Sequence, residues 1–377
     1  MARPLKPSFA SPRVVVIGAG LMGLWPAVHL AEAGCAVTVL EAGKPARGAS
    51  WAAAGMLAPA SEAGEGATDT PSILGAFGIH SLALWRDWAG RFDSAGHDIC
   101  WRPSGSLQSA FDEDGVQTLE RRRRAALALG MTARMLSADT ARRLEPELAD
   151  GLHAALLIED EASVDPRLVL TALQALLADA GGALQSGVMV KAVESSGGAL
   201  RICCADGRRL AADKVVLATG FAAGAVAGME ELVQRIAPVK GQMLALATGA
   251  KLGPVIRDAR AYIVPRGHGR VVIGATSEPG KADNSTDDET IAGLHRGAAA
   301  VVPVLARASI AERWAGVRPH SRDGLPLIGA LGVPGVFANC GHYRNGVLLA
   351  PASAAMLSAL VLEQQGSPFD EALRPAR

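Results

Sequence analysis

Apolar runs of strand length alternate with segments of helical periodicity along this chain of 377 residues. The apolar run 14–17 leads into a glycine-rich turn, a helical segment at about 22–33 and a second apolar run, 36–40. Strand, turn, helix and strand within about 30 residues predict a βαβ unit. Pro26 is unfavourable in the interior of this predicted helix, because a proline removes a backbone hydrogen bond there. It is harmless only in the first turn.

Helical periodicity returns further along the chain. It marks four more segments, at about 79–92, 113–129, 137–147 and 166–180. Asp165 can cap the last of these helices, and Pro166 suits its first position. Between 188 and 216 the apolar period shifts toward two and glycine turns intervene, which predicts short hairpins.

Three further segments complete the expected elements. Residues 214–217 read as a buried strand, and 262–265 with 270–274 predict another hairpin. The apolar segment 346–362 is interrupted by Pro351 and falls short of the roughly 20 residues that cross a membrane. It therefore predicts a buried helix.

Charge and cysteine content narrow the class of protein. Thirty-seven basic and 37 acidic side chains balance, so no net field would recruit nucleic acid or an anionic membrane. The arginine run 121–124 lies in a predicted helix, and we expect these side chains to be exposed to solvent. The first thirteen residues lack the apolar region of a signal peptide. We expect a cytoplasmic protein without a metal site, whose five cysteines are buried free thiols: Cys35, Cys100, Cys203, Cys204 and Cys340.

The glycines of the first turn carry candidate chemistry. Gly18, Gly20 and Gly23 have the spacing that gives a tight turn, a close approach to a pyrophosphate, and close packing of helix on sheet. The helix N-terminus would then face the phosphates, and Glu41 would bind ribose hydroxyls. This predicts a dinucleotide site without choosing between NAD and FAD. The later strand ending in Ala218-Thr219-Gly220 is typical of flavin and NAD(P) disulfide-type or amine oxidoreductases.

Five further motifs occur in a fixed order: AAGML at 53–57, PVKGQ at 238–242, YIVPR at 262–266, WAGVRP at 314–319 and GHYRNGVLLAP at 341–351. With them the sequence resembles the D-amino-acid oxidase superfamily, and within it the glycine-oxidase branch of thiamine biosynthesis. The similarity runs from about residue 13 to about residue 372. GHYRNG with the following LLAP is its most selective part, and GxGxxG the least.

The resemblance implies an α/β fold of two interwoven parts. One is an FAD-binding, Rossmann-like domain of the glutathione-reductase type, and the other is an α+β substrate domain with an antiparallel sheet. The expected boundaries are 13–79, 149–235 and 321–365 for the FAD-binding domain, 80–148 and 236–320 for the substrate domain, and 1–12 and 366–377 for the tails.

It also implies an activity: FAD-dependent oxidative deamination of glycine, other small amines or D-amino acids. Oxygen would be the electron acceptor and hydrogen peroxide a product. The enzyme would supply glycine imine for the thiazole of thiamine. Relatives are often homotetramers. A D-amino-acid dehydrogenase or a sarcosine-type oxidase with another amine or acceptor stays open, as do an NAD(P) dehydrogenase and a flavin-binding scaffold.

Site residues carry over by motif position. Substrate contacts fall at Tyr262, Arg318 and Arg344. Cofactor contacts fall at Gly18, Gly20, Leu21, Met22, Gly23, Glu41, Ala49, Ser50, Ala54, Gly55, Met56, Val190, His342, Tyr343, Arg344, Asn345, Gly346, Val347 and Leu348.

Physical chemistry supports two of these roles independently. The guanidinium of Arg318 is a planar fork that can hold a carboxylate through two hydrogen bonds. A helix that starts near Asn345 would place free N–H groups and a positive dipole end where negative charge develops on a reduced flavin. Hydride transfer from a neutral amine needs no side-chain base, so His342 is assigned to the structure of the flavin loop alone.

Overall fold

The βαβ unit begins a six-stranded sheet in the computed structural model, which describes residues 11–62, 72–232 and 234–377. Strand β1 (Arg13–Ile17) pairs in parallel with β2 (Ala36–Glu41) and β12 (Lys214–Leu217), and α1 (Leu21–Glu32) connects β1 to β2. The strand order is β19-β20-β12-β1-β2-β8. The three other strands are β8 (Ala183–Ser186), β19 (Leu327–Ala330) and β20 (Val336–Cys340).

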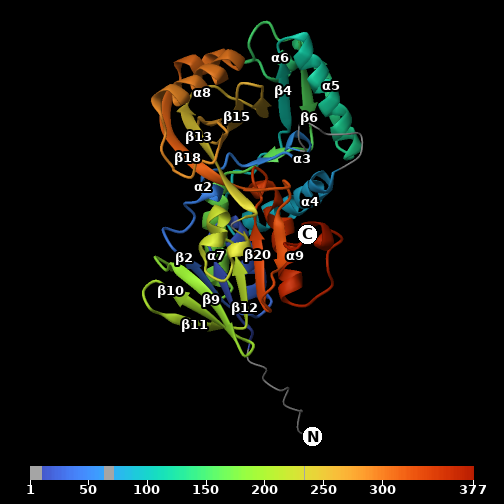
Figure 1. Ribbon diagram of the computed structural model, residues 1–377. Coiled ribbons are helices and arrows are strands. Elements are labelled where there is room, and N and C mark those ends of the chain that lie inside the picture. The colour runs from blue at the N-terminus through green and yellow to red at the C-terminus, as the bar shows by residue number, and fades with distance from the viewer. Residues whose placement is uncertain (1–10, 63–71, 233) are drawn as a thin grey trace.

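Alternate side chains of β1 enter two different apolar cores, as the two-residue period of a strand requires. Val14 and Val16 pack with one layer of helices, whereas Val15 and Ile17 pack under a three-stranded antiparallel meander. The sheet is thus covered on both faces (Figure 1). The covering elements are α1, α4 (Ile73–Ser94), α7 (Pro166–Asp179) and α9 (Gly346–Val361) on one side, and β9 (Val190–Ser196), β10 (Ala199–Cys204) and β11 (Arg209–Ala212) on the other.

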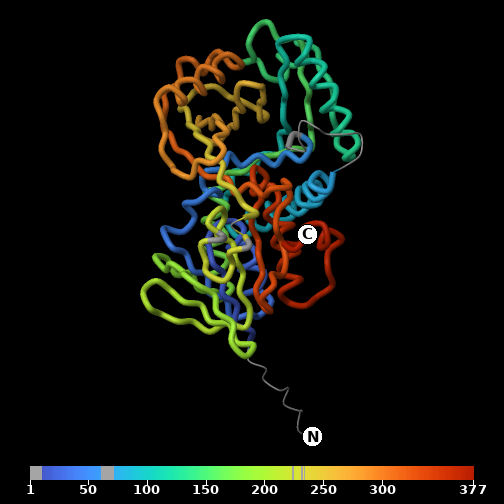
Figure 2. Tube along the Cα trace, in the orientation of Figure 1, coloured from blue at the N-terminus to red at the C-terminus, as the bar shows by residue number. Residues whose placement is uncertain are grey.

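A second, nine-stranded and largely antiparallel sheet forms the upper body in Figures 1 and 2. Its longest strands, β13 (Ile236–Ala247) and β18 (Ser309–Ser321), pair over almost their whole length. Helix α5 (Glu113–Ala128) packs on β4 to β6, and α8 (Asp288–Val301) packs on β13 and β16. The other strands are β4 (Ser106–Ala110), β5 (Ala133–Ser137), β6 (Ala154–Ile158), β14 (Val255–Arg257), β15 (Tyr262–Pro265), β16 (Arg270–Gly274) and β17 (Glu278–Pro279).

Short elements complete the two bodies and the connections between them. Strands β3 (Met56–Leu57) and β7 (Ala162–Ser163) pair with each other in an antiparallel ladder. The short elements are α2 (Ala49–Ala52), β3 (Met56–Leu57), α3 (Pro59–Glu62), α6 (Ala138–Leu144), β7 (Ala162–Ser163), α10 (Asp370–Leu373) and the 3₁₀ turns Gly220–Ala225, Glu230–Leu232 and Pro303–Arg307. Within the described residues no helix combines the length and the apolar character needed to cross a bilayer.

The interwoven α/β architecture expected from the sequence is confirmed, while the domain boundaries stay a prediction. Both sheets draw on several separate segments, so the chain passes repeatedly between the bodies (Figure 2). The expected boundary at residue 149 would group residues 154–158 with the cofactor domain. Those residues form β6, which pairs with β4 and β5 in the nine-stranded sheet.

Helix α4 starts earlier than the expected residue 79. It begins at Ile73, because Ser72 caps it by accepting a hydrogen bond from the N–H of Gly75 at 3.0 Å. Gly75 and Gly78 lower helix propensity, but both lie where a side chain would collide with neighbouring elements: a Cβ on Gly78 would stand 3.0 Å from Pro59. Tertiary packing therefore decides the start of this helix.

Two smaller expectations were wrong in part. Cys35, Cys204 and Cys340 are buried free thiols as expected, whereas Cys100 and Cys203 are only half-buried. The arginine run on α5 is also not uniformly solvated. Arg122 turns inward and donates to Oε1 of Gln108 at 2.7 Å. Four successive side chains of a helix point in directions spread around its whole circumference. At least one of the four arginines therefore faces the rest of the protein.

Candidate active site

A cavity of about 1070 Å³ lies between the two bodies. It opens at the carboxyl ends of β1, β2 and β12, the edge at which parallel sheets bind their ligands. Its far wall comes from β13, β15, β16 and β18 of the second sheet. One cavity therefore joins the predicted cofactor residues to the predicted substrate residues.

The glycine turn between β1 and α1 is built for close approach. Gly18 has a φ of +108°, and a Cβ there would stand 2.5 Å from the carbonyl oxygen of Ala218. A Cβ on Gly23 would overlap the carbonyl oxygen of Gly18. Among the described residues the N–H groups of Gly20 and Met22 have no acceptor, so the start of α1 presents free donors to the cavity.

Glu41 ends β2 beside this turn, as expected. Its carboxylate accepts from the N–H of Ala19 at 2.9 Å and from the N–H of Gly43 at 3.0 Å. These two bonds fix the carboxylate at the cavity wall, in the position that binds ribose hydroxyls in dinucleotide folds. Val190, at the start of β9, lines the same end of the cavity.

The segment around α2 is held from both sides of the cavity. The hydroxyl of Ser50 accepts from the N–H of Leu21 at 3.1 Å, which ties this segment to the start of α1. On the other side, the indole of Trp314 donates to the carbonyl of Ala52 at 2.9 Å, and Arg266 donates to the carbonyl of Ala54. Residues of the second sheet thus position a backbone segment of the first body.

Helix α9 begins at the cavity wall. Asn345 is its N-cap residue, and the N–H groups of Gly346 and Val347 have no acceptor in the described chain. Tyr343 has a φ of +49° and donates its N–H to the carbonyl of Pro319 at 2.8 Å, which turns the loop toward the helix. The positive dipole end expected from the sequence is therefore present at the cavity.

A proline inside α9 is compensated by α4. Pro351 lacks the N–H that would donate to the carbonyl of Val347, and the indole of Trp85 donates there instead at 3.1 Å. The hydroxyl of Ser81 donates to the carbonyl of Leu348 at 2.6 Å and accepts from the N–H of Ala352 at 3.3 Å. Side chains of α4 thus complete the first turns of α9.

His342 is buried next to this helix. Its Nε2 and the hydroxyl of Ser353 form a hydrogen bond of 2.9 Å, and burial lowers the pKa of the imidazole to about 3. The neutral ring packs within the loop, and its role toward the cofactor stays a prediction.

Acid should destabilise the protein through this histidine. Its pKa is depressed in the folded state, so the unfolded chain binds the proton more tightly, and stability falls as the pH drops from about 6.5 toward 3. Urea unfolding at pH 7 and pH 5 should show a smaller pH dependence for His342→Asn than for the parent. An unchanged slope would contradict the neutral, buried imidazole.

Arg318 extends from β18 into the cavity. Its Nη1 donates to the carbonyl of Thr276 at 3.1 Å and to the carbonyl of Lys240 at 3.4 Å. Among the described residues no carboxylate pairs with this guanidinium, and Nη2 makes no hydrogen bond. Arg318 is therefore fixed in place with donors left over for an anionic ligand.

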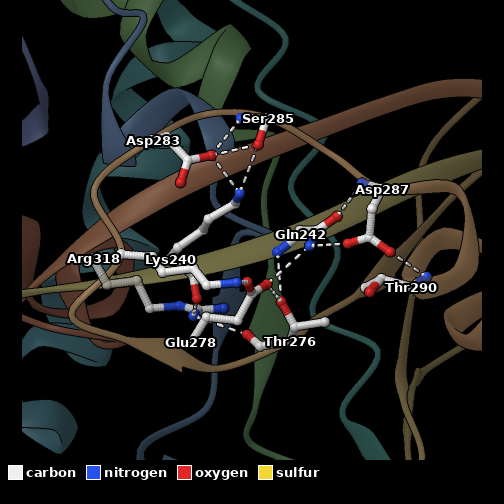
Figure 3. Close-up of polar contacts among 10 residues, drawn as sticks. Lys240, Gln242, Thr276, Glu278, Asp283, Ser285, Asp287, Thr290 and Arg318 are labelled. Carbon is white, nitrogen blue, oxygen red and sulfur yellow. Dashed lines mark hydrogen bonds and ion pairs between the residues drawn. The ribbon is translucent and has the colours of Figure 1, made fainter.

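A polar network behind Arg318 fixes both of those carbonyls (Figure 3). The backbone N–H of Gln242 donates to the hydroxyl of Thr276 at 2.9 Å, and its amide nitrogen donates to Asp287 at 2.8 Å. The side chain of Lys240 pairs with Asp283. Hydrogen bonds from Gln242 and Thr290 lower the pKa of Asp287 to about 2, so this carboxylate is charged at neutral pH.

Two glycines make room for the substrate residues. A Cβ on Gly241 would stand 2.6 Å from Cζ of Arg318, and a Cβ on Gly274 would stand 2.5 Å from Cζ of Tyr262. The hydroxyl of Tyr262 lies 3.8 Å from the sulfur of Met243. The guanidinium and the aromatic ring thus lie flat against backbone that only glycine leaves open.

Gly241→Ala should displace the guanidinium of Arg318 and raise the KM for a carboxylated substrate by about tenfold, because charged hydrogen bonds of this kind contribute about 1.5–3 kcal/mol. Steady-state kinetics and bound-flavin content measure the effect. Gly249→Ala is the matched control, since a Cβ there meets nothing within 4 Å. Equal KM values in the two variants would contradict the placement.

The structure brings the predicted site residues together around the cavity, with three exceptions. Leu21, Gly23 and Leu348 are buried behind its wall. Arg344 lines it together with Arg318 and Tyr262. Their roles toward ligands stay predictions.

Among the lining residues that sequence reasoning missed, two have buried polar side-chain atoms. The hydroxyl of Thr219 is buried without a partner in the described chain, and Asn339 on β20 is fully buried. Thr219 belongs to the Ala-Thr-Gly signal, which flagged its strand but not its side chain. No sequence pattern singled out Asn339.

These features fit FAD. Two helix starts present free donors, Gly18 forms a cradle that a Cβ would fill, and the cavity exceeds the roughly 300–1,000 Å³ of sites for drug-sized ligands. A parallel sheet with a glycine turn, joined across one cavity to an antiparallel sheet that carries a fixed arginine, defines a dinucleotide-dependent oxidoreductase. Residues 13–360 match the family described as FAD dependent oxidoreductase, DAO. The chain belongs to this family, and FAD is its cofactor.

Individual relatives are similar over nearly the whole chain. A glycine oxidase of Bacillus licheniformis is 33% identical over 353 residues, which are 92% of each chain. A bifunctional ThiO/ThiG protein of Synechocystis is 31% identical over 97% of this chain, which spans only 54% of that protein. The crystal structure of glycine oxidase from Geobacillus kaustophilus superposes with a TM-score of 0.89 at 29% identity, covering 97% of this chain and 98% of the other.

Proposed function

We propose that this protein oxidises glycine and other small amines with FAD as its cofactor. The observation that carries the proposal is the guanidinium of Arg318, fixed at the cavity by two backbone carbonyls and paired with no described carboxylate. A small amino acid offers little besides its carboxylate for binding, and a guanidinium that is held in place can bind that carboxylate through two hydrogen bonds. Similarity to glycine oxidases, at 33% and 32% identity, adds support.

When bound, FAD supplies a two-electron acceptor for the hydride that leaves Cα of the substrate. The resulting imine hydrolyses to ammonia and a keto acid, which is glyoxylate from glycine. The chain's own residues orient the substrate: Arg318 binds its carboxylate, and Tyr262 borders the same pocket. The start of α9 stabilises the negative charge that develops beside it. Hydride transfer requires the neutral amine form of the substrate, and the buried His342 is not assigned as a base for it.

We further propose oxygen as the electron acceptor, with hydrogen peroxide as the product, and the cytoplasm as the place of action. The five cysteines are unpaired, which suits a reducing compartment. Similarity to the ThiO/ThiG protein of Synechocystis supports a role in supplying glycine imine for the thiazole of thiamine.

An anaerobic absorbance titration with glycine, sarcosine and D-alanine tests the proposal. Glycine should bleach the visible absorption band of the oxidised flavin, and air should then restore it with one peroxide per turnover. Bleaching without peroxide would indicate a dehydrogenase. Bound flavin that no amine bleaches would indicate a scaffold, and a colourless protein would indicate an NAD(P) enzyme.

A further inference from the structure

The proline in α1 leaves a backbone carbonyl without its helical partner. Pro26 is the sixth residue of α1, which begins at Leu21, so it lies beyond the first turn. A residue at this position normally donates its N–H to the carbonyl four residues earlier, which is that of Met22. Proline has no N–H, so this carbonyl needs another donor.

Asn339 supplies that donor from β20. Its Nδ2 lies 2.8 Å from the carbonyl oxygen of Met22. Because a carbonyl can only accept, the amide nitrogen must point toward Met22 and the amide oxygen must point the other way. Pro26 thus sets the orientation of the Asn339 side chain, although the two residues are distant in sequence.

The remaining amide oxygen is a buried acceptor on a residue that lines the cavity. Asn339 is 0% exposed and lines the cavity, and its Oδ1 has no partner among the described residues. A buried acceptor of this kind is normally paired, and a donor on the ligand of this cavity would pair with it.

The position of Asn339 indicates which part of the ligand it would contact. On one side it is bonded to Met22 in the first turn of α1, which faces the pyrophosphate. On the other side it precedes by two residues the loop that begins at Gly341 and leads to the flavin-facing start of α9. Between the pyrophosphate and the ring of FAD lies the ribityl chain. Its hydroxyls are donors, whereas a pyrophosphate has none.

We propose that Oδ1 of Asn339 accepts a hydrogen bond from a ribityl hydroxyl of FAD, and that Pro26 orients the amide for it. Asn339 thereby has two separable roles: Nδ2 completes the first turn of α1, and Oδ1 binds the cofactor. The inference rests on the FAD of the family and is independent of which amine is oxidised.

A double-mutant cycle separates the two roles. Asn339→Leu removes both hydrogen bonds. Pro26→Ala restores an N–H that can donate to the carbonyl of Met22, which makes the structural role of Asn339 dispensable. The four proteins are the parent, each single variant and the double variant. Each is compared by thermal melting of the apoprotein and by fluorescence titration of the apoprotein with FAD.

Asn339→Leu should lower the melting temperature more in the parent than in the Pro26→Ala variant, because only in the parent does it leave the carbonyl of Met22 unpaired. It should weaken FAD binding by about 2- to 13-fold in both backgrounds, the range for loss of one neutral hydrogen bond. Ser358→Ala is the matched control: that hydroxyl is buried and unpartnered in the described chain but lies off the cavity wall, so FAD affinity should not change.

FAD analogues that lack single ribityl hydroxyls assign the donor. One deoxy analogue should bind the parent more weakly than FAD does, and the double variant should not distinguish that analogue from FAD. Equal FAD affinity of Pro26→Ala and the double variant would overturn the proposal and leave Asn339 with a structural role alone. This outcome is independent of activity toward amines, which tests the proposed function separately.

Discussion

Gly23→Ala should give a protein without bound flavin. The added Cβ would overlap the carbonyl oxygen of Gly18, so either the glycine turn or the start of α1 must move. We expect a loss of about 3 kcal/mol of stability, typical of forced overpacking, together with loss of the cofactor cradle. The ratio of flavin to protein absorbance and a thermal melt measure both effects.

Gly90→Ala provides the matched comparison. Gly90 lies on the exposed side of α4, and a Cβ there meets nothing within 4 Å. Alanine favours a helix by up to about 1 kcal/mol over glycine, so this variant should keep its flavin and melt slightly higher. A yellow, stable Gly23→Ala protein would show that helix and sheet are not packed as closely as the structure has them.

Arg318→Ala should lower kcat/KM for glycine by about 12- to 160-fold, with most of the change in KM. This range corresponds to the roughly 1.5–3 kcal/mol that hydrogen bonds to a charged group contribute. Flavin content should stay unchanged, because the residue lies on the wall of the second sheet. Lysine should restore only part of the loss, since an ammonium cannot reproduce the planar fork.

Arg313→Ala on the same strand is the control for Arg318. Arg313 is 52% exposed, and its ion-pair partner Asp288 is 89% exposed, so its removal should leave the kinetics unchanged. If Arg318→Ala kept the parent's apparent affinity for glycine, the residue would have no part in binding the carboxylate, and the proposed function would lose its main support.

The cofactor half of the cavity could be predicted because its parts lie in short contiguous motifs. Gly18 and Gly23 are required because a Cβ at either position would collide with backbone, and Glu41 follows at the end of the next strand. The start of α9 at Gly346, after Asn345, was similarly readable from its loop sequence and the apolar run that follows. Each of these motifs is contiguous in the chain, so the sequence alone displays all of its residues.

The substrate half depends on relations across strands, which a single sequence does not display. Gly241 is glycine because the guanidinium of Arg318 lies over it, and Gly274 because the ring of Tyr262 does. These pairs are set by the register of antiparallel strands, and register follows from the assembled sheet. Arg318 and Tyr262 were found through resemblance, and the glycines beneath them were not found at all.

Pro26 is a second feature whose structural role the sequence alone could not show, although its helix was predicted. Its place in the sequence left open whether it lies in the first turn or in the helix interior. The structure shows that it lies in the interior, where Asn339 compensates for its missing N–H by bonding to Met22, 317 positions away. A compensation at that separation is visible only once both ends of the chain are in place.

The walls of the cavity reach from Ile17 to Val347, and this span has a consequence for biosynthesis. The turn at Gly18 is synthesised early, but the Asn339 amide that completes its helix comes 317 positions after Met22, and the loop that closes the other wall follows it. A nascent chain therefore has no finished pocket to fill. Flavin can therefore be bound by the complete site only after both of these segments have been synthesised and folded together.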